Sequence, residues 1–478
     1  MTTSRQLEIP FTAGRRGSGP ATWGQRAIWG VVNRAAPADR PRFNITTAAP
    51  LDPGLPLPAV LDALGHLLHL HDSLHTRLLP GPDGTGLRQQ VDPEGRLTVH
   101  VRDCAAGTGR EELTAVGDAL HEELAGLPFD CATEWPVRAG LVVADGLVRH
   151  ISLVLSHTAV DGTGMGLLVR DLSELSLGAG PEDIRAARSP QQPLEEAAFQ
   201  TSERGLKRDA NARAHALRKL RAAPVRLFPE RGAGHPAGGT AGDTAGDTAA
   251  GAAGTGSGER FPNAVLSSPA LLRAVETVAA AHRTGSSTVL LAAAAAMTAR
   301  LAGRPDAVLQ VVVNNRFLSG LTDAVSVVAG DALFHLHDAD GDFGQAVGRT
   351  HAASIAAYRH AYYDRDLLDA EIERLTAEEV PLADRSCVFN DTRDLLPSSL
   401  AARAAPVPDE AGPTTLDWPV DFDPRPGLTY ALDALNTPTA LQLAMTADPA
   451  VLPRPAMERF LRGIEELILT EEKRTAQA

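Results

Sequence analysis

The sequence predicts an α/β fold that consists of two similar sandwiches, each with helices packed on a sheet. The chain has 478 residues, which is too many for one hydrophobic core and enough for two domains of about 200 residues each. Segments with strand and helix patterns alternate in both halves of the chain, as they do where helices cover a sheet.

Hydrophobic periodicity locates the elements of the first half. Apolar residues recur at helical spacing in three segments, and two short apolar runs joined by a turn at Asp145-Gly146 are typical of strands. Pro58 suits the first turn of the first helix. The predicted helices are Leu57–His71, Leu113–Leu124 and Met165–Leu177, and the predicted strands are Leu141–Val143 and Ile151–Leu155.

The second half repeats this alternation. Its predicted helices are Pro269–His282, Ser287–Leu301, Phe343–Tyr358 and Arg454–Leu469. Ala307–Val313 is a valine-rich strand with little alternation, which indicates burial on both faces. Between the halves, a basic helix is expected within 202–231. The low-complexity run 232–258 cannot bury enough apolar surface to order itself, so a flexible surface loop is expected there.

Composition and charge exclude several classes of function. The formal net charge is −14, which argues against general nucleic-acid binding. Cys104, Cys131 and Cys387 lie far apart without a CxxC pair, so neither a disulfide framework nor a thiolate zinc site is expected. No signal-like apolar stretch opens the chain, and its most apolar run, Val289–Met297, is about half of a membrane span. We therefore expect a cytoplasmic protein that binds no nucleic acid and no membrane.

The segment from Leu155 to Gly164 contains the residues best suited to chemistry. His157 directly follows a predicted buried strand, and Asp161-Gly162 predicts a tight turn into the next helix. Histidine has a reference pKa of about 6.5 and can accept or donate a proton at neutral pH. Asp161 could orient His157 or anchor the loop, and spacing alone does not separate a catalytic histidine from an ordinary turn histidine.

The order of the surrounding motifs indicates a family. His157-Thr-Ala-Val-Asp161-Gly162 resembles the HxxxDG core of the condensation-domain superfamily. That superfamily includes nonribosomal peptide condensation domains and, more distantly, chloramphenicol acetyltransferase and plant HxxxD acyltransferases. Further segments resemble the family's motifs in the same order along nearly the whole chain: Trp23–Trp29, Leu70–Leu78, Leu127–Asp130, Trp135–Ala139, Val311–Arg316 and Ala440–Asp448.

The resemblance implies a particular architecture. Two chloramphenicol-acetyltransferase-like lobes would be arranged in a V around a central tunnel, and donor and acceptor would enter the tunnel from opposite faces. Residues 1–180 would form the N-terminal lobe that carries HxxxDG, and residues 181–478 would form the C-terminal lobe.

The resemblance also assigns the site residues. His157, Asp161 and Gly162 form the implied catalytic motif, with the histidine midway along the tunnel. Asp161 is expected to point away from the substrate and to pair with Arg316 of the second lobe. Ser156, which stands where the family usually has another histidine, is expected to support the loop.

The sequence departs from the family's pattern in two other places. Leu70 and His75 stand where the family usually has arginines. The DFGWG-like motif of the second lobe is not evident, because Leu416-Asp-Trp418-Pro matches it poorly. These departures bear on which donor and acceptor are used more than on the type of reaction.

The implied activity is that of a free-standing acyltransferase that forms an amide bond between an acyl thioester and an amine in nonribosomal peptide-type biosynthesis. The thioester supplies the driving force, so no bound cofactor is expected. The acyl group would arrive on CoA or on the phosphopantetheine of an acyl or peptidyl carrier protein acting in trans. A partly neutral amine is already nucleophilic, whereas an alcohol needs a general base, which raises the reaction rate by roughly 10²–10⁴-fold. Ester formation onto an alcohol, and a degenerate fold that recruits a partner enzyme, remain alternatives.

Two further patterns have plainer interpretations. Arg213, Arg218 and Lys219 belong to an arginine-rich segment that is either a solvated helical face or a docking surface for an acidic carrier protein. His71 and His75 have the two-histidine spacing of a zincin helix. No third ligand signature accompanies them, so no metal site is expected.

Overall fold

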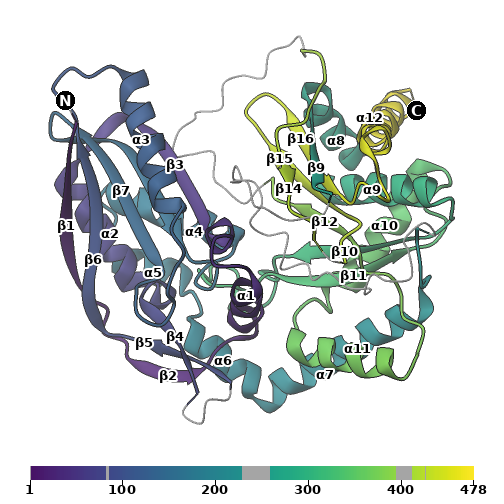
Figure 1. Cartoon of the computed structure of the whole chain (residues 1–478), viewed down its shortest axis with the longest axis horizontal. Helices are drawn as coiled ribbons and strands as arrows, with labels where there is room; N and C mark the ends of the chain where they lie inside the picture. The colour runs from purple at the N-terminus through teal and green to yellow at the C-terminus, as the bar shows by residue number, and fades with distance from the viewer. Residues whose placement is uncertain (1, 82–85, 229–258, 394–411, 426, 478) are drawn as a thin grey trace.

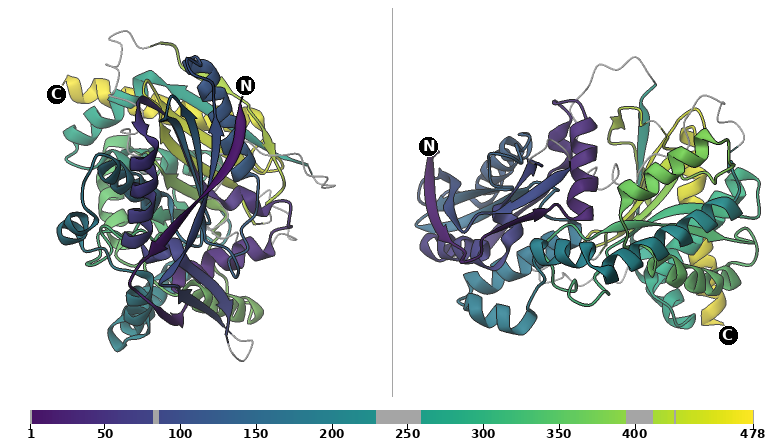
Figure 2. Two further views of the ribbon diagram at one scale, coloured as in Figure 1. Left: turned by 90° about the vertical axis from the view of Figure 1, so that its left-hand side faces the viewer. Right: turned by 90° about the horizontal axis from the view of Figure 1, so that it is seen from below.

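The structure is a computed structural model, and it describes residues 2–81, 86–228, 259–393, 412–425 and 427–477. The run predicted to be a flexible loop, 232–258, lies outside these residues. Two α/β halves lie side by side, each with its own sheet, and helix α1 (Trp23–Arg34) lies between them (Figure 1). Figure 2 shows the same arrangement from two further directions. The predicted α/β fold with two lobes in a V is confirmed.

The sheet of the first half is covered by helices on both faces. Its strands and helices are β1 Thr3–Thr12, β3 Ile45–Pro56, β6 Glu94–Asp103, β7 Val137–Ala144, β8 Leu147–Leu155, α2 Leu57–Leu70, α3 Arg110–Ala125 and α4 Gly162–Ser176. The strand order is β1-β6-β7-β8-β3, and β6 and β7 run parallel while the other neighbours are antiparallel. Leu153 and Leu155 of β8 join the core beneath α2 and α4, whereas Val154 packs against α3 on the opposite face.

A small sheet and a series of short helices accompany the first half. The sheet consists of β2 Gly17–Pro20, β5 Leu87–Val91 and β4 Thr76–Pro80, in that order. The helices are α5 Pro181–Arg188, α6 Pro193–Thr201 and α7 Glu203–Ala222, and single 3-10 turns lie at Arg40–Phe43 and Asp72–His75. The predicted basic helix is α7, and the Ser202 side chain caps it by accepting from Gly205 N at 3.2 Å.

The sheet of the second half combines parallel and antiparallel strands. Its elements are β9 Phe261–Ser268, β10 Ala307–Val313, β11 Gly330–Leu336, β12 Cys387–Asp391, β13 Thr415–Asp417, β14 Asp421–Phe422, β15 Tyr430–Asn436, β16 Leu441–Ala447, α8 Pro269–Ala281, α9 Ser286–Ala302, α10 Phe343–Tyr358, α11 Arg365–Ala377 and α12 Arg454–Ala476. The strand order is β11-β10-β12-β15-β16-β9-β13, and β14 pairs with β9. β10, β12 and β15 run parallel to one another.

Helix α9 lies at the centre of the second core. Its residues from Thr288 to Ala299 are all buried, because it contacts α8, α10, α12 and β10. The Thr298 hydroxyl donates to the Ala294 carbonyl at 2.7 Å, so its burial leaves no unsatisfied donor. By length and composition, no single described helix could cross a membrane, although α8 and α9, bent by 102°, pass that test as a pair.

The last helix is longer than predicted. Apolar periodicity ends at Leu469, but α12 continues to Ala476. The buried carboxylate of Glu471 accepts hydrogen bonds from His282 at 2.7 Å and from Arg474 at 2.8 Å. These polar contacts support the final turns where the hydrophobic pattern has stopped.

The two sheets divide the chain between β8 and β9. The lobe boundary predicted near residue 180 falls inside this interval, between α4 and α5. Helix α5 contacts α2 of the first half, and α7 contacts β11 of the second half, so the chain crosses from one half to the other through these helices. The exact residue of the boundary stays a prediction.

Candidate active site

The predicted catalytic loop joins two well-packed elements of the first half. β8 ends at Leu155 and α4 begins at Gly162, with His157 in the turn between them. Ser156 supports this turn, because its hydroxyl lies 2.8 Å from the Thr158 hydroxyl and 3.3 Å from the Thr158 amide nitrogen. Both anchoring elements belong to the first core, so the position of the histidine is set by core packing.

The His157 ring has a defined tautomer. Its Nδ1 lies 2.8 Å from the Val160 carbonyl oxygen, which can only accept, so Nδ1 carries the proton and Nε2 carries the lone pair. Nε2 is buried and has no hydrogen-bond partner among the described residues. Burial lowers the pKa of His157, so the ring is neutral at neutral pH. The arrangement presents a neutral imidazole with an available basic nitrogen.

Asp161 connects this loop to the second half. Its carboxylate lies 2.9 Å and 3.0 Å from the Arg316 guanidinium, and both side chains are buried. It also accepts from the backbone amides of Gly164 at 2.7 Å, Val328 at 3.0 Å and Ala329 at 2.9 Å. Burial acts to raise the pKa of Asp161, but the charge and hydrogen bonds of Arg316 and these amides hold it below its usual range. The predicted Asp161–Arg316 pair is present.

Arg316 is itself held in a fixed orientation. Its Nη2 donates to the carbonyl of Ala324 at 2.8 Å and to that of Ser326 at 3.2 Å. The guanidinium therefore joins the strand end after β10, the segment before β11 and the HxxxDG loop. The contacts join the loop that carries His157 to the second half, and the predicted supporting role of Asp161 and Arg316 stays a prediction.

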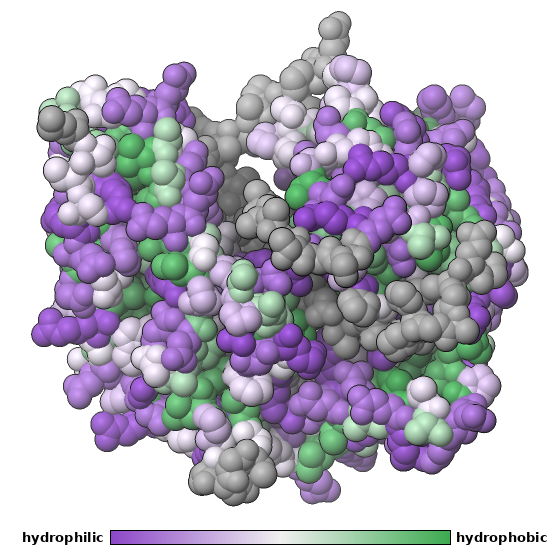
Figure 3. Space-filling view, viewed as in Figure 1, coloured by the Kyte–Doolittle hydropathy of each residue, from purple (hydrophilic) through white to green (hydrophobic). Residues whose placement is uncertain are grey.

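A cavity of about 390 Å³ lies between the two halves, within the size range of small-molecule sites. In Figure 3 the surface is hollowed between the halves in the upper centre. The first half contributes His157, Asp161, Gly162 and Thr163, together with Gly24, Ala27 and Ile28 of α1. The second half contributes an apolar group, Val312, Val313, Phe317, Val327 and Tyr358, and a polar group, Ser287, Asn314, Asp331, Arg365, Asn390, Asp391 and Thr392.

Solved structures with the same architecture identify the fold. The starter condensation domain of rhizomide synthetase, solved with C8-CoA, matches with a TM-score of 0.65 at 17% identity over 95% of each chain. The chain has the condensation-domain fold. The SgcC5 protein from Streptomyces globisporus, solved with a naphthyl ethanediol and sucrose, matches with a TM-score of 0.63 at 19% identity over 95% of this chain and 99% of its own. These structures agree with the predicted fold.

The chain matches parts of two curated synthetases. The chain is 32% identical over 167 residues to a probable nonribosomal peptide synthetase of Salinispora arenicola. It is 25% identical over 363 residues to an isonitrile lipopeptide synthase of Mycobacterium tuberculosis. These alignments cover 34% and 73% of this chain, but only 2% and 13% of the respective synthetases. No protein-family model matches the chain.

The predicted N-terminal motif, Trp23–Trp29, lies in α1, which packs against the cavity. Thr22 and Gln25 form a capping box at the start of the helix. The Trp23 ring lies 5.1 Å from that of Tyr362, which belongs to the second half. A Cβ atom on Gly24 would lie 2.0 Å from the Val327 carbonyl oxygen, so only glycine permits this close approach of α1 to the second half.

The two predicted motifs within Leu127–Ala139 contact each other. Arg138 donates to the carbonyls of Leu127 and Pro128, each at 2.8 Å, and its guanidinium lies 3.8 Å from the centre of the Phe129 ring. These contacts close the loop that precedes β7. None of these residues lines the cavity, so their contacts support the lobe itself.

Sequence patterns did not indicate Glu196 of α6, which lies close to the ion pair. It is buried, and its carboxylate accepts from the Tyr362 hydroxyl at 2.9 Å and from Gln200 at 3.0 Å. Burial raises the pKa of Glu196 to about 7, although its hydrogen bond with Tyr362 and the charge of Arg316 oppose that rise. Tyr362 and Arg316 lie far along the chain from Glu196, so no local pattern could have found it.

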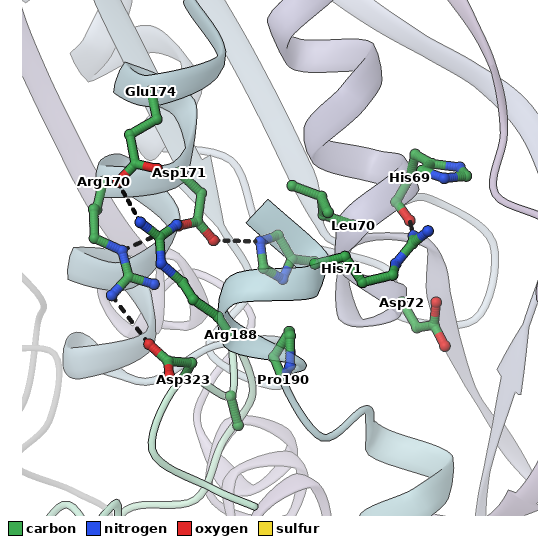
Figure 4. Close-up of polar contacts among 12 residues, drawn as sticks. His69, Leu70, His71, Asp72, Arg170, Asp171, Glu174, Arg188, Pro190 and Asp323 are labelled. Atoms are coloured by element: carbon green, nitrogen blue, oxygen red, sulfur yellow. Dashed lines mark hydrogen bonds and ion pairs between the residues drawn. The ribbon is translucent and has the colours of Figure 1, made fainter. Parts of the chain in front are cut away.

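The two histidines with zincin spacing do not act together. His71 Nε2 lies 3.0 Å from the Asp171 carboxylate, whereas His75 lies near Asp72, at 3.7 Å. Figure 4 shows His71, Asp171, Arg170 and Asp323 as one polar network. In it Arg170 of α4 donates to Asp171 at 3.1 Å and to Asp323, in the second half, at 3.1 Å. This network therefore ties α4 to the second half beside the active-site loop.

The predicted docking residues differ in their surroundings. Arg213 is paired with Asp209 of its own helix at 2.8 Å, so its charge is already engaged. Arg218 is exposed and Lys219 is half-buried. A docking role for α7 stays a prediction, and Arg218 and Lys219 are better placed for it than Arg213.

Proposed function

We propose that this protein is an acyltransferase that joins an acyl thioester to an amine, with His157 at the reacting centre. The observation that carries the proposal is the state of the His157 ring: it lines the cavity between the halves, its Nδ1 is committed to Val160, and its Nε2 has no partner in the described part of the chain. A buried, unpartnered nitrogen is costly unless a bound molecule supplies the missing hydrogen bond.

The proposed reaction forms one C–N bond and breaks one C–S bond. The amine nitrogen attacks the thioester carbonyl carbon, and the tetrahedral intermediate collapses with loss of the thiol. The amine loses a proton and the departing sulfur gains one, and Nε2 is the group that accepts or directs this proton. The lowered pKa of His157 makes it a weak base, which suits an amine that is already partly neutral better than an alcohol.

The other motif residues position the histidine. Ser156 holds the turn through Thr158, and Gly162 begins α4 directly after Asp161. Asp161 and Arg316 pair with each other across the two halves. None of these side chains is needed as a proton carrier in the proposed reaction.

The proposed donor is a thioester on CoA or on the phosphopantetheine of an acyl or peptidyl carrier protein. The rhizomide starter domain, which shares this fold, was solved with C8-CoA, and this supports a CoA-type donor. The SgcC5 protein was solved with a diol, so hydroxylated acceptors belong in the test panel. A cavity of about 390 Å³ favours turnover over a recruitment platform, which would not need an open site.

The test compares wild type with His157→Ala, and with His66→Ala as a matched control on the exposed face of α2. Each protein is incubated with acyl-CoA or acyl-pantetheine thioesters and paired amines and alcohols, and products are read by intact mass. Amide formed by wild type and His66→Ala but lost in His157→Ala supports the proposal. Equal turnover by all three proteins, or ester as the sole product, contradicts it.

A further inference from the structure

Three metal-binding side chains meet at one edge of the second sheet, outside the site described above. Asp306 precedes β10, His335 lies in β11, and His337 follows β11. The same Asp306 oxygen lies 3.1 Å from His335 Nε2 and 3.2 Å from His337 Nδ1. The ring centres of the two histidines are 4.1 Å apart.

Strand register explains why these residues meet. Ala307 pairs with Leu336 in the antiparallel ladder of β10 and β11, so Asp306 lies opposite His337. His335 lies two residues before His337 and therefore on the same face of the ladder. A His-x-His pair on one strand and a carboxylate on its neighbour thus project from one side of the sheet.

We propose that Asp306, His335 and His337 form a binding site for a divalent transition-metal ion of the Zn²⁺ type. Zinc bonds to histidine nitrogen and carboxylate oxygen are about 2.0–2.2 Å long, so tetrahedral ligands lie roughly 3.3 Å apart. The two separations from Asp306 agree with this spacing. Imidazole and carboxylate ligands suit Zn²⁺, and three protein ligands leave the fourth position for water.

Burial and exposure are graded across the cluster. The His335 side chain is 2% exposed, that of Asp306 23% and that of His337 68%, so an ion would enter from the His337 side. Lys219 also lies near His335, and its charge opposes cation binding without occupying the ligand atoms.

The backbone around the cluster is held in place. The Ala339 amide donates to the Pro305 carbonyl at 2.6 Å, which closes the chain beyond the ladder. Arg349 of α10 donates to the Asp338 carbonyl at 2.8 Å, so the segment that carries His337 is fixed to a helix. A pre-arranged set of ligands lowers the cost of binding an ion.

The cluster is independent of the proposed catalytic function. Asp306, His335 and His337 are absent from the lining of the cavity that contains His157. The proposed ion would join the neighbouring ends of β10 and β11, which is a structural role. Loss of the metal site and loss of acyl transfer are therefore separate results.

The test uses chelator-treated full-length protein and Zn²⁺ alone, followed by isothermal titration calorimetry. Wild type is expected to bind one Zn²⁺ per chain at this site. His337→Ala is exposed enough to fold normally and should weaken binding by at least about 100-fold, beyond the roughly 10–100-fold lost when a supporting contact is removed. His69→Ala is the matched control, because His69 also contacts one carboxylate, Glu182, at 3.3 Å.

Cobalt provides a second readout. Co²⁺ in wild type and in His69→Ala should show the visible absorption of a tetrahedral complex, and His337→Ala should not. Zn²⁺ should raise the melting temperature of wild type but leave that of His337→Ala unchanged. Equal affinities in wild type and His337→Ala, or no saturable binding by wild type, would overturn the proposal and leave a hydrogen-bonded cluster.

Discussion

Replacing Arg316 by methionine removes the guanidinium that joins the second half to Asp161. The two side chains are 6% and 3% exposed, so the remaining carboxylate would stay buried without its counter-charge. Removal of one partner from a buried pair costs about 3–5 kcal/mol of unfolding free energy. Three backbone amides would still donate to Asp161, so we expect a loss near the lower end, about 3 kcal/mol.

The assay is equilibrium urea unfolding at pH 7, followed by circular dichroism. Arg462→Met is the matched control, because Arg462 pairs with Glu458 at 2.8 Å on the surface, where a pair is worth less than about 1 kcal/mol. The double variant with Asp161→Asn should lose less than the sum of the two single variants, since the two side chains contact each other. A loss for Arg316→Met no larger than that for Arg462→Met would refute the reasoning.

The Asp161–Arg316 pair should also affect how the stability of the protein changes at acidic pH. The folded-state pKa of Asp161 lies below its unfolded value, so the carboxylate's contribution to the free energy of unfolding is fully present above the unfolded pKa of about 3.9. It is lost as the pH falls through the lower folded pKa. Without Arg316 the folded pKa should rise, so acid unfolding of Arg316→Met should begin at higher pH than that of wild type. Superimposable acid-unfolding curves would contradict this.

Three further predictions concern the surroundings of the site. The folded pKa of Glu196, about 7, lies above the ordinary glutamate value of 4.5, so wild-type stability should fall by roughly 3 kcal/mol as the pH rises between those values. Urea unfolding at pH 5 and pH 8 should show this fall for wild type but not for Glu196→Gln, and an equal change in both proteins would contradict the prediction. Gly24→Ala should destabilise the protein by about 1–3 kcal/mol, because the added Cβ would overlap the Val327 carbonyl. The control is Gly30→Ala, whose added Cβ would meet only the flexible end of the Arg34 side chain. Equal urea midpoints for the two variants would argue against the overlap. The double variant Arg218→Glu/Lys219→Glu should raise the KM for a carrier-bound donor but leave the KM for a CoA donor unchanged. The control Lys207→Glu, exposed on the same helix, should change neither KM. An unchanged KM for the carrier-bound donor in the double variant would contradict a docking role for α7.

Elements with strong apolar periodicity were predicted closely. β10 and α10 have the predicted bounds, α2 and α8 differ by one residue at one end, and α9 differs by one residue at each end. Their patterns arise because each buries a continuous face or its whole circumference in a core. β1 and β3 were not predicted. β1 pairs with β6 along its whole length but is mostly exposed, so it lacks a clear apolar pattern.

The sequence by itself determined the fold and the HxxxDG loop, because ordered motifs and local periodicity are properties of contiguous residues. The Asp161–Arg316 pair followed from the family resemblance, and the structure contains it. Only the tertiary structure decided the tautomer of His157, the burial of Glu196 and the meeting of Asp306 with His335 and His337. Each of these depends on a hydrogen-bond partner, a buried environment or a strand register that exists only once the chain has folded.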